Sequence, residues 1–173
     1  MPIGRNKLIG RGMTRWVDTL IGGWQVNGMY RWSSGQPLIL GLSGGNAVPT
    51  WGGQRPNLSA TLSQASGVNL DQYFADPNVA SVPAAYTLGS APKTVGSVRA
   101  PGTNVMSASL FKEFAVSQVR EGLKAEVRLE TFNTLNHPTF GAPNTTVGTS
   151  SFGLITSQAN SPREVQLGLK VYF

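Results

Sequence analysis

The chain has 173 residues, of which only 13% are charged, and it contains 21 glycines, 11 prolines and no cysteine. That length suffices for one domain with a core, but the low charge and the many turn-forming residues are unusual for a soluble protein, and disulfides and thiolate metal sites are excluded. The formal net charge is +6, yet the basic residues are scattered after residue 15 without a recognisable motif, so we expect no nucleic-acid partner.

The first 21 residues are rich in glycine and basic side chains, and they predict a strand end followed by a turn or one helical turn. No run of about 18 apolar residues occurs, so no transmembrane helix is predicted. The N-terminus also lacks the apolar core of a signal peptide. If the protein belongs in an outer membrane, we therefore expect the chain to be a fragment of a longer one.

Residues 22–40 predict the first clear strand. Side chains alternate between the two sides of a strand, which places on one face Trp24, Val26, Gly28, Tyr30 and Trp32. Such rings are typical of the aromatic girdle of a membrane barrel, although a sheet face packed on a soluble core would show the same pattern. Gly35 would accommodate a bulge, after which residues 38–40 could continue the strand.

Residues 43–104 show no sustained periodicity and predict a long loop. A structureless connection of this length is improbable inside a compact soluble domain, whereas outer-membrane barrels place long loops outside the cell. Some aromatic residues of this loop are candidates for contact with a ligand, or alternatively pin the loop to itself. These candidates are Trp51, Tyr73, Phe74 and Tyr86.

Residues 106–116 and 123–135 predict a hairpin. The first strand has an apolar face interrupted by Lys112, and the second alternates apolar residues with Lys124, Glu126, Arg128 and Glu130. These charges would line a solvated face in a soluble protein and a wet lumen wall in a barrel. We expect the register that sets Glu113 opposite Lys124 rather than Glu126, because like charges directly opposite are destabilising.

A second loop is predicted over 137–162, with a short ribbon at 152–155, and a last strand over 163–173. The apolar face of that strand consists of Val165, Leu167, Leu169, Val171 and Phe173, and its other face of Gln166, Gly168, Lys170 and Tyr172. A closing strand of an outer-membrane barrel has this pattern, with its apolar face to lipid and its polar face, including Gln166 and Lys170, to the lumen. An edge strand of a soluble protein could also show it.

The predicted fold is therefore all-β, an antiparallel up-and-down meander of about four or five strands with long extracellular loops. We interpret residues 1–173 as one partial domain, a C-terminal segment of a large transmembrane β-barrel. A closed membrane barrel needs about eight strands at least, so we expect the chain to be a fragment or to share a barrel with other chains.

The sequence holds no evident catalytic group. His137 is the only histidine and has no acidic or nucleophilic neighbour, while Glu126 and Glu130 would lie about 13 Å apart along a strand, too far to act on one bond. No histidine or cysteine cluster has metal-ligand spacing. We expect a protein that is not an enzyme, with no catalytic, cofactor-binding or metal-binding residues.

Several segments, taken in order, resemble the C-terminal part of TonB-dependent outer-membrane receptors of the Oar-like type, whose N-terminal region carries a carboxypeptidase-regulatory-like domain. The matching segments are Gly22-Gly-Trp-Gln-Val-Asn-Gly28, Ser34-Gly-Gln-Pro37, Gly96-Ser-Val-Arg-Ala-Pro-Gly102, Ser109-Leu-Phe-Lys112, Arg128-Leu-Glu-Thr-Phe-Asn-Thr-Leu-Asn-His-Pro-Thr-Phe-Gly141 and Pro162-Arg-Glu-Val-Gln-Leu-Gly-Leu-Lys-Val-Tyr-Phe173.

The resemblance implies a barrel of about 22 strands around a plug, located in the bacterial cell outer membrane, that imports an unidentified ligand. The implied partners are outer-membrane lipid, the rest of the barrel and plug of the parent protein, TonB through the missing N-terminal region, and the barrel-assembly machinery. That machinery would read Tyr172 and Phe173 together with Val165, Leu167, Leu169 and Val171. The alternatives are a complete, non-transporting β-rich surface or ligand-binding protein and, third, an outer-membrane barrel enzyme.

Overall fold

The computed structural model describes residues 12, 14, 17, 20–44, 54–67, 69–115 and 122–173. These residues fall into two compact units. The strand unit comprises Met1–Arg31, Asn104–His137 and Ser161–Phe173, and the loop unit comprises Trp32–Thr103 and Pro138–Asn160. The turn expected within residues 1–21 lies largely outside the described part. Within that part, no helix has the length and apolar character needed to cross a membrane.

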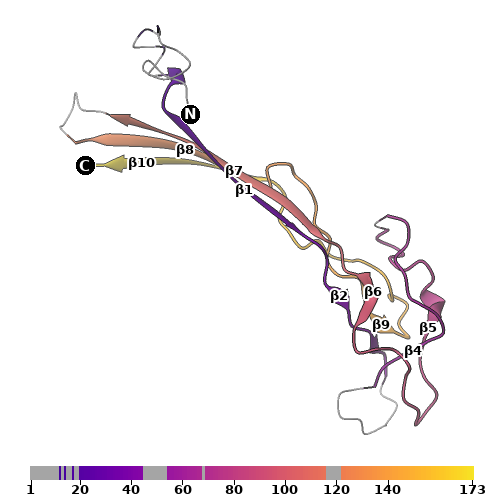
Figure 1. Cartoon of the computed structure of the whole chain (residues 1–173). Coiled ribbons are helices and arrows are strands. Elements are labelled where there is room, and N and C mark those ends of the chain that lie inside the picture. The colour runs from indigo at the N-terminus through magenta and orange to yellow at the C-terminus, as the bar shows by residue number, and fades with distance from the viewer. Residues whose placement is uncertain are drawn as a thin grey trace. The chain divides into compact units, whose positions relative to one another are not determined.

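Four long strands form the main sheet (Figure 1), in the order β1 (Trp24–Ser33), β7 (Thr103–Ala115), β8 (Lys124–Phe132) and β10 (Glu164–Tyr172). Neighbours in the sheet are also successive long strands of the sequence, so the predicted all-β antiparallel meander is confirmed. Period-2 alternation of apolar and polar residues explains why these segments are extended, because one face of each strand is apolar and the other polar.

The pairing of β8 with β10 sorts the side chains into two faces. Antiparallel partners on the polar face are Lys124 and Tyr172, Glu126 and Lys170, Arg128 and Gly168, and Glu130 and Gln166. Partners on the apolar face are Ala125 and Val171, Val127 and Leu169, Leu129 and Leu167, and Thr131 and Val165. Paired residues point to the same side of a sheet, so the two predicted alternations coincide across the strand pair.

The register expected for the β7–β8 hairpin is wrong. Glu113 lies opposite Glu126, and Lys124 lies opposite Ala115. Two carboxylates can face each other here because Glu126 is paired along its own strand with Arg128, at 2.9 Å, while Glu113 is exposed. The predicted register considered only which charges lie opposite each other on the two strands. It did not include the neutralisation of Glu126 by Arg128 within β8.

Lys112 does interrupt the apolar face, as expected. It lies opposite Val127 and is only 3% exposed. Its ammonium nitrogen lies 5.6 Å from the ring centroid of Trp24 and 5.2 Å from that of Phe114. Aromatic faces attract a cation, so these rings stabilise the charge on this side of the sheet.

The loop unit holds short strand pairs. β2 (Pro37–Leu38) pairs with β6 (Val95–Arg99), β4 (Asn57–Leu58) with β5 (Ala80–Ser81), and β3 (Gly41–Leu42) runs parallel to β9 (Thr146–Val147). A 3₁₀ turn, η1 (Pro77–Val79), precedes β5. The described part of the segment 43–104 therefore contains short strand pairs, because its residues have partners far away in the sequence that no local pattern reveals.

Two details of the loop unit also differ from expectation. Residues 38–40 do not prolong β1, and a Cβ on Gly35 would lie 1.5 Å from the carbonyl oxygen of Ala100. Gly35 therefore permits a close approach of two backbones rather than a bulge in one strand. Residues 152–155 form no ribbon; a turn ends there, with the Phe152 amide donating to the Thr149 carbonyl at 3.2 Å.

The loop unit has a hydrophobic core of its own. The core consists of Leu38, Leu40, Leu62, Tyr73, Phe74, Val95, Val98 and Ile155. Phe74 lies at its centre, with ring centroids 5.9 Å from Tyr73 in an edge-on arrangement and 4.8 Å from Phe152. Burial of these side chains stabilises the loop unit, which contains only short strands in its described part.

Candidate functional site: the polar face of the sheet

Charged side chains form a ladder along the polar face of β8. Arg128 contacts Glu126 through Nε at 3.0 Å and Nη2 at 2.9 Å, and its Nη1 lies 3.3 Å from Glu130. The side chain of Glu126 is only 5% exposed, and its second oxygen accepts a hydrogen bond from the Tyr172 hydroxyl at 3.3 Å. The buried carboxylate of Glu126 is therefore contacted by Arg128 of its own strand, β8, and by Tyr172 of β10.

Neighbouring strands complete this surface. The Arg128 guanidinium carbon lies 5.3 Å from the Phe111 ring centroid, and the Lys170 ammonium lies 5.1 Å from the Tyr172 ring. Gly168 stands opposite Arg128 and places no side chain there. The six residues predicted to face the lumen thus share one face: Lys124, Glu126, Arg128, Glu130, Gln166 and Lys170. That this face lines a lumen stays a prediction.

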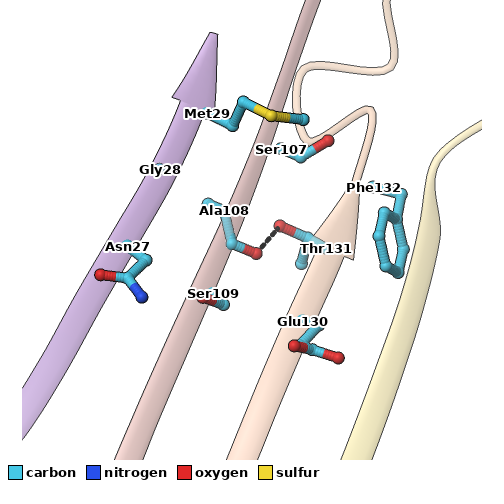
Figure 2. A pocket seen from close by; sticks show the side chains of 9 residues that line it. All are labelled: Asn27, Gly28, Met29, Ser107, Ala108, Ser109, Glu130, Thr131 and Phe132. Atoms are coloured by element: carbon cyan, nitrogen blue, oxygen red, sulfur yellow. Dashed lines mark hydrogen bonds between the residues drawn. The ribbon is translucent and has the colours of Figure 1, made fainter.

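A shallow hollow of about 200 Å³ lies across β1, β7 and β8 (Figure 2). By alternation, its polar-face side chains are Asn27, Met29, Ser107, Ser109, Glu130 and Phe132. The small residues Gly28 and Ala108 lie between them, and the Thr131 hydroxyl donates to the Ala108 carbonyl at 3.1 Å. The hollow therefore arises where small side chains on the middle strand are flanked by larger ones.

The hollow combines two kinds of group. Glu130, Asn27 and the serines offer hydrogen-bonding atoms, while Met29 and Phe132 offer exposed apolar surface. Such a surface can contact a ligand that has both polar and apolar parts. In the described part of the chain, no group of three or more histidine, cysteine or acidic side chains is placed to hold a metal ion.

Sequence reasoning missed the hollow. Its floor is made by Ser107 and Ser109 of β7, which lie near Gly28 of β1 only because of how those two strands pair. Small residues at polar positions of adjacent strands are the signal that could have found it. That signal becomes readable only after the strand order and register are known.

The last strand presents a bare apolar face. Val165, Leu167, Leu169 and Val171 are all exposed, and Phe173 is 94% exposed. β10 is also an outer strand of the described sheet, so one of its edges has no strand beside it. Exposed apolar side chains on an open strand edge form a surface suited to contact with lipid or another strand.

The four aromatic candidates in the loop have different places. Trp51 lies outside the described residues, and Tyr73 and Phe74 are buried in the core of the loop unit. This placement fits the alternative interpretation that they pin the loop to itself. Tyr86 is 82% exposed and has a left-handed backbone with a φ of 59°, which is uncommon for a bulky residue.

Tyr73 illustrates how the loop unit is fixed. Its hydroxyl donates to the carbonyl of Arg99, and its backbone amide donates to the carbonyl of Gly153 at 3.0 Å. Burial raises the pKa of the Tyr73 phenol above its ordinary value of 10.0, because the charged phenolate would lose its hydration. Tyr73 thus binds Arg99 through its neutral hydroxyl and Gly153 through its backbone, and so links two segments that are distant in the sequence.

Comparison with known proteins gives the class. A family model described as an outer membrane beta barrel domain matches residues 1–166. The chain belongs to this family of outer-membrane β-barrel domains, which places it in the outer membrane and agrees with its antiparallel meander. Searches of curated proteins and of solved structures found no match.

Proposed function

We propose that the chain is the C-terminal part of a TonB-dependent outer-membrane transporter or receptor, which takes up an unidentified ligand. The supporting observation is an asymmetry of the sheet. The segments that make up the loop unit connect the end of β1 to the start of β7 and the end of β8 to the start of β10. At the opposite strand ends, β7 and β8 are joined by the short connection over 116–123.

This asymmetry matches an outer-membrane barrel, in which long loops are extracellular and short turns are periplasmic. In the proposed orientation the apolar face meets outer-membrane lipid and the polar face meets the lumen. Tyr86 and the hollow beside Glu130 then offer candidate contacts for the ligand outside the cell and along the lumen wall. We assign no catalytic activity and no cofactor to the chain.

The main sheet has four strands within the described residues, whereas a closed barrel needs about eight at least. In this proposal the rest of the parent protein's barrel supplies the other strands, and its plug fills the barrel. TonB contacts the parent protein through its N-terminal region. The barrel-assembly machinery contacts β10 and Phe173.

A non-transporting surface or ligand-binding protein is the second candidate. The observation that favours it is the core of the loop unit, because a folded loop can present a binding surface without any transport. The two candidates differ in their dependence on TonB.

The test uses the complete reading frame that contains this chain. A transporter is expected to include a plug domain and a TonB-contacting segment, and that segment should form a disulfide cross-link with TonB when cysteines are placed in both. A complete reading frame without a plug domain, or a plug-containing protein that never cross-links to TonB, would favour the second candidate.

A further inference from the structure

The turn that follows β8 contains two residues with left-handed backbones. Asn133 has a φ of 50° and Asn136 has a φ of 52°. Asparagine adopts this conformation more readily than most residues, but a single left-handed residue is still uncommon. Two of them within four residues indicate that the surrounding contacts determine the shape of this turn.

Asn133 joins the two residues that flank the segment Pro138–Asn160. Its side-chain nitrogen donates to the carbonyls of His137, at 3.2 Å, and Ser161, at 3.1 Å. Its side-chain oxygen accepts from the His137 amide at 2.9 Å. The residue is only 5% exposed, so one enclosed amide holds the residue before the segment and the residue after it.

Asn136 and Thr134 extend these bonds to the neighbouring strands. The Asn136 side-chain oxygen accepts from the Arg163 amide at 3.0 Å, directly before β10 begins at Glu164. The Thr134 amide donates to the Met106 carbonyl of β7 at 2.7 Å. The turn over 133–137 is therefore bonded to β7 and to the residue directly before β10.

The position of this turn gives it a mechanical role. The first pair of the β8–β10 ladder is Phe132 with Glu164, immediately beside the bonds made by Asn133 and Asn136. Strand pairs open most easily from their ends, where few contacts oppose local unfolding. A side chain that fixes both chain ends at this point opposes that opening.

We propose that Asn133 and Asn136 form a clamp that isolates the β8–β10 strand pair from the segment Pro138–Asn160. Opening or cutting of that segment then leaves the strand pair closed. The clamp follows from the geometry of the turn and does not depend on whether the parent protein transports a ligand.

The experiment uses the complete parent protein in lipid nanodiscs, with a thrombin recognition sequence inserted after Ser150. Hydrogen exchange of peptides covering β8 and β10 is measured before and after cleavage. With both asparagines present, cleavage should change exchange less than about twofold. In Asn133→Ala, which loses three side-chain hydrogen bonds, cleavage should accelerate exchange at 130–132 and 164–166 at least about tenfold, which corresponds to about 1.4 kcal/mol.

Two further variants keep the proposal testable if Asn133→Ala does not fold. Asn136→Gly preserves the left-handed backbone but removes the acceptor for Arg163, and it should also show accelerated exchange after cleavage. Asn144→Ala is the matched control, because its side chain bonds only Ser151 and Thr146 within the loop unit. Equal exchange in the cleaved parent and in the cleaved clamp variants would overturn the clamp.

Discussion

Phe74 has no exposed surface, whereas Tyr86, twelve residues later, is almost fully exposed. We predict that Phe74→Ala lowers the free energy of unfolding of the loop unit by about 3–5 kcal/mol, because a buried ring is replaced by a cavity. Tyr86→Ala should change it by less than about 0.5 kcal/mol. Limited proteolysis of the parent protein in urea measures both. Equal sensitivity of the two variants would contradict the assignment of Phe74 to the core.

Tyr73 makes the loop unit sensitive to strong base. Its pKa is raised by burial, so between the ordinary value of 10.0 and the raised value the folded state keeps a proton that the unfolded state has lost. Stability should therefore be unaffected by this residue below about pH 10 and should fall as the pH rises further. The tyrosinate absorbance of the parent protein minus that of Tyr73→Phe gives the midpoint for this residue. A midpoint at or below 10.0 would refute the prediction.

Strand β10 offers a direct test of which face of the sheet meets lipid. Gln166 and Leu167 are adjacent and lie on opposite faces. In the assembled parent, we predict that a charged thiol reagent labels Gln166→Cys and that a lipid-soluble reagent labels Leu167→Cys. The opposite preference would reverse the two faces.

Leu169→Arg tests the same face by its energy. The side chain lies opposite Val127 on the apolar face and is exposed. Near the middle of a membrane, arginine on the lipid face should destabilise the barrel by about 2–4 kcal/mol. Urea unfolding in lipid vesicles measures the change. Lys170→Leu is the matched control on the polar face, and an equal cost for the two would argue against a lipid-facing Leu169.

The main strands could be predicted from the sequence because their information is local. In residues 163–173, the alternation of apolar and polar residues indicates which side chains lie on each face of β10, and this does not require knowing which strands lie beside it. The β7–β8 register could not be predicted, since it depends on how Arg128 neutralises Glu126 within one strand. The core of the loop unit could not be predicted for a related reason. Phe74 packs on Phe152, and the local sequence around either residue does not indicate that they are in contact.

For the candidate site, the sequence predicted the charged ladder and missed the hollow. Alternation along β8 is sufficient to place Lys124, Glu126, Arg128 and Glu130 on one face. The hollow depends on the order and register of three strands, which alternation does not specify.

For the whole molecule, the two outer strands of the main sheet determine behaviour in water. β1 and β10 each have one edge without a partner strand among the described residues, and the apolar face of β10 is exposed. We predict that the isolated 173-residue chain aggregates in plain buffer and stays dispersed in detergent. Size-exclusion chromatography with light scattering measures this. A monodisperse monomer that melts cooperatively without detergent would contradict the prediction.

Delivery to the membrane should depend on the exposed end of β10. We predict that deletion of Phe173 from the parent protein lowers its level in purified outer membranes several-fold, because the proposed assembly signal loses its terminal ring. Phe152→Ala is an unsuitable control, since Phe152 packs against Phe74 in the loop-unit core. Tyr86→Ala changes an exposed aromatic residue instead, and equal membrane levels for it and the Phe173 deletion would remove the proposed role.

In the proposed orientation the loop unit lies outside the cell, and its core limits which of its residues can be substituted. Exposed loops ordinarily tolerate many substitutions. Here Tyr73 and Phe74 are committed to packing, and Gly35 and Gly89 leave no room for a side chain, since a Cβ would lie 1.5 Å and 1.8 Å from the nearest carbonyl oxygen. Tolerated substitutions should therefore concentrate at exposed positions such as Tyr86, whereas the buried core residues, which no external molecule can contact, should hardly vary.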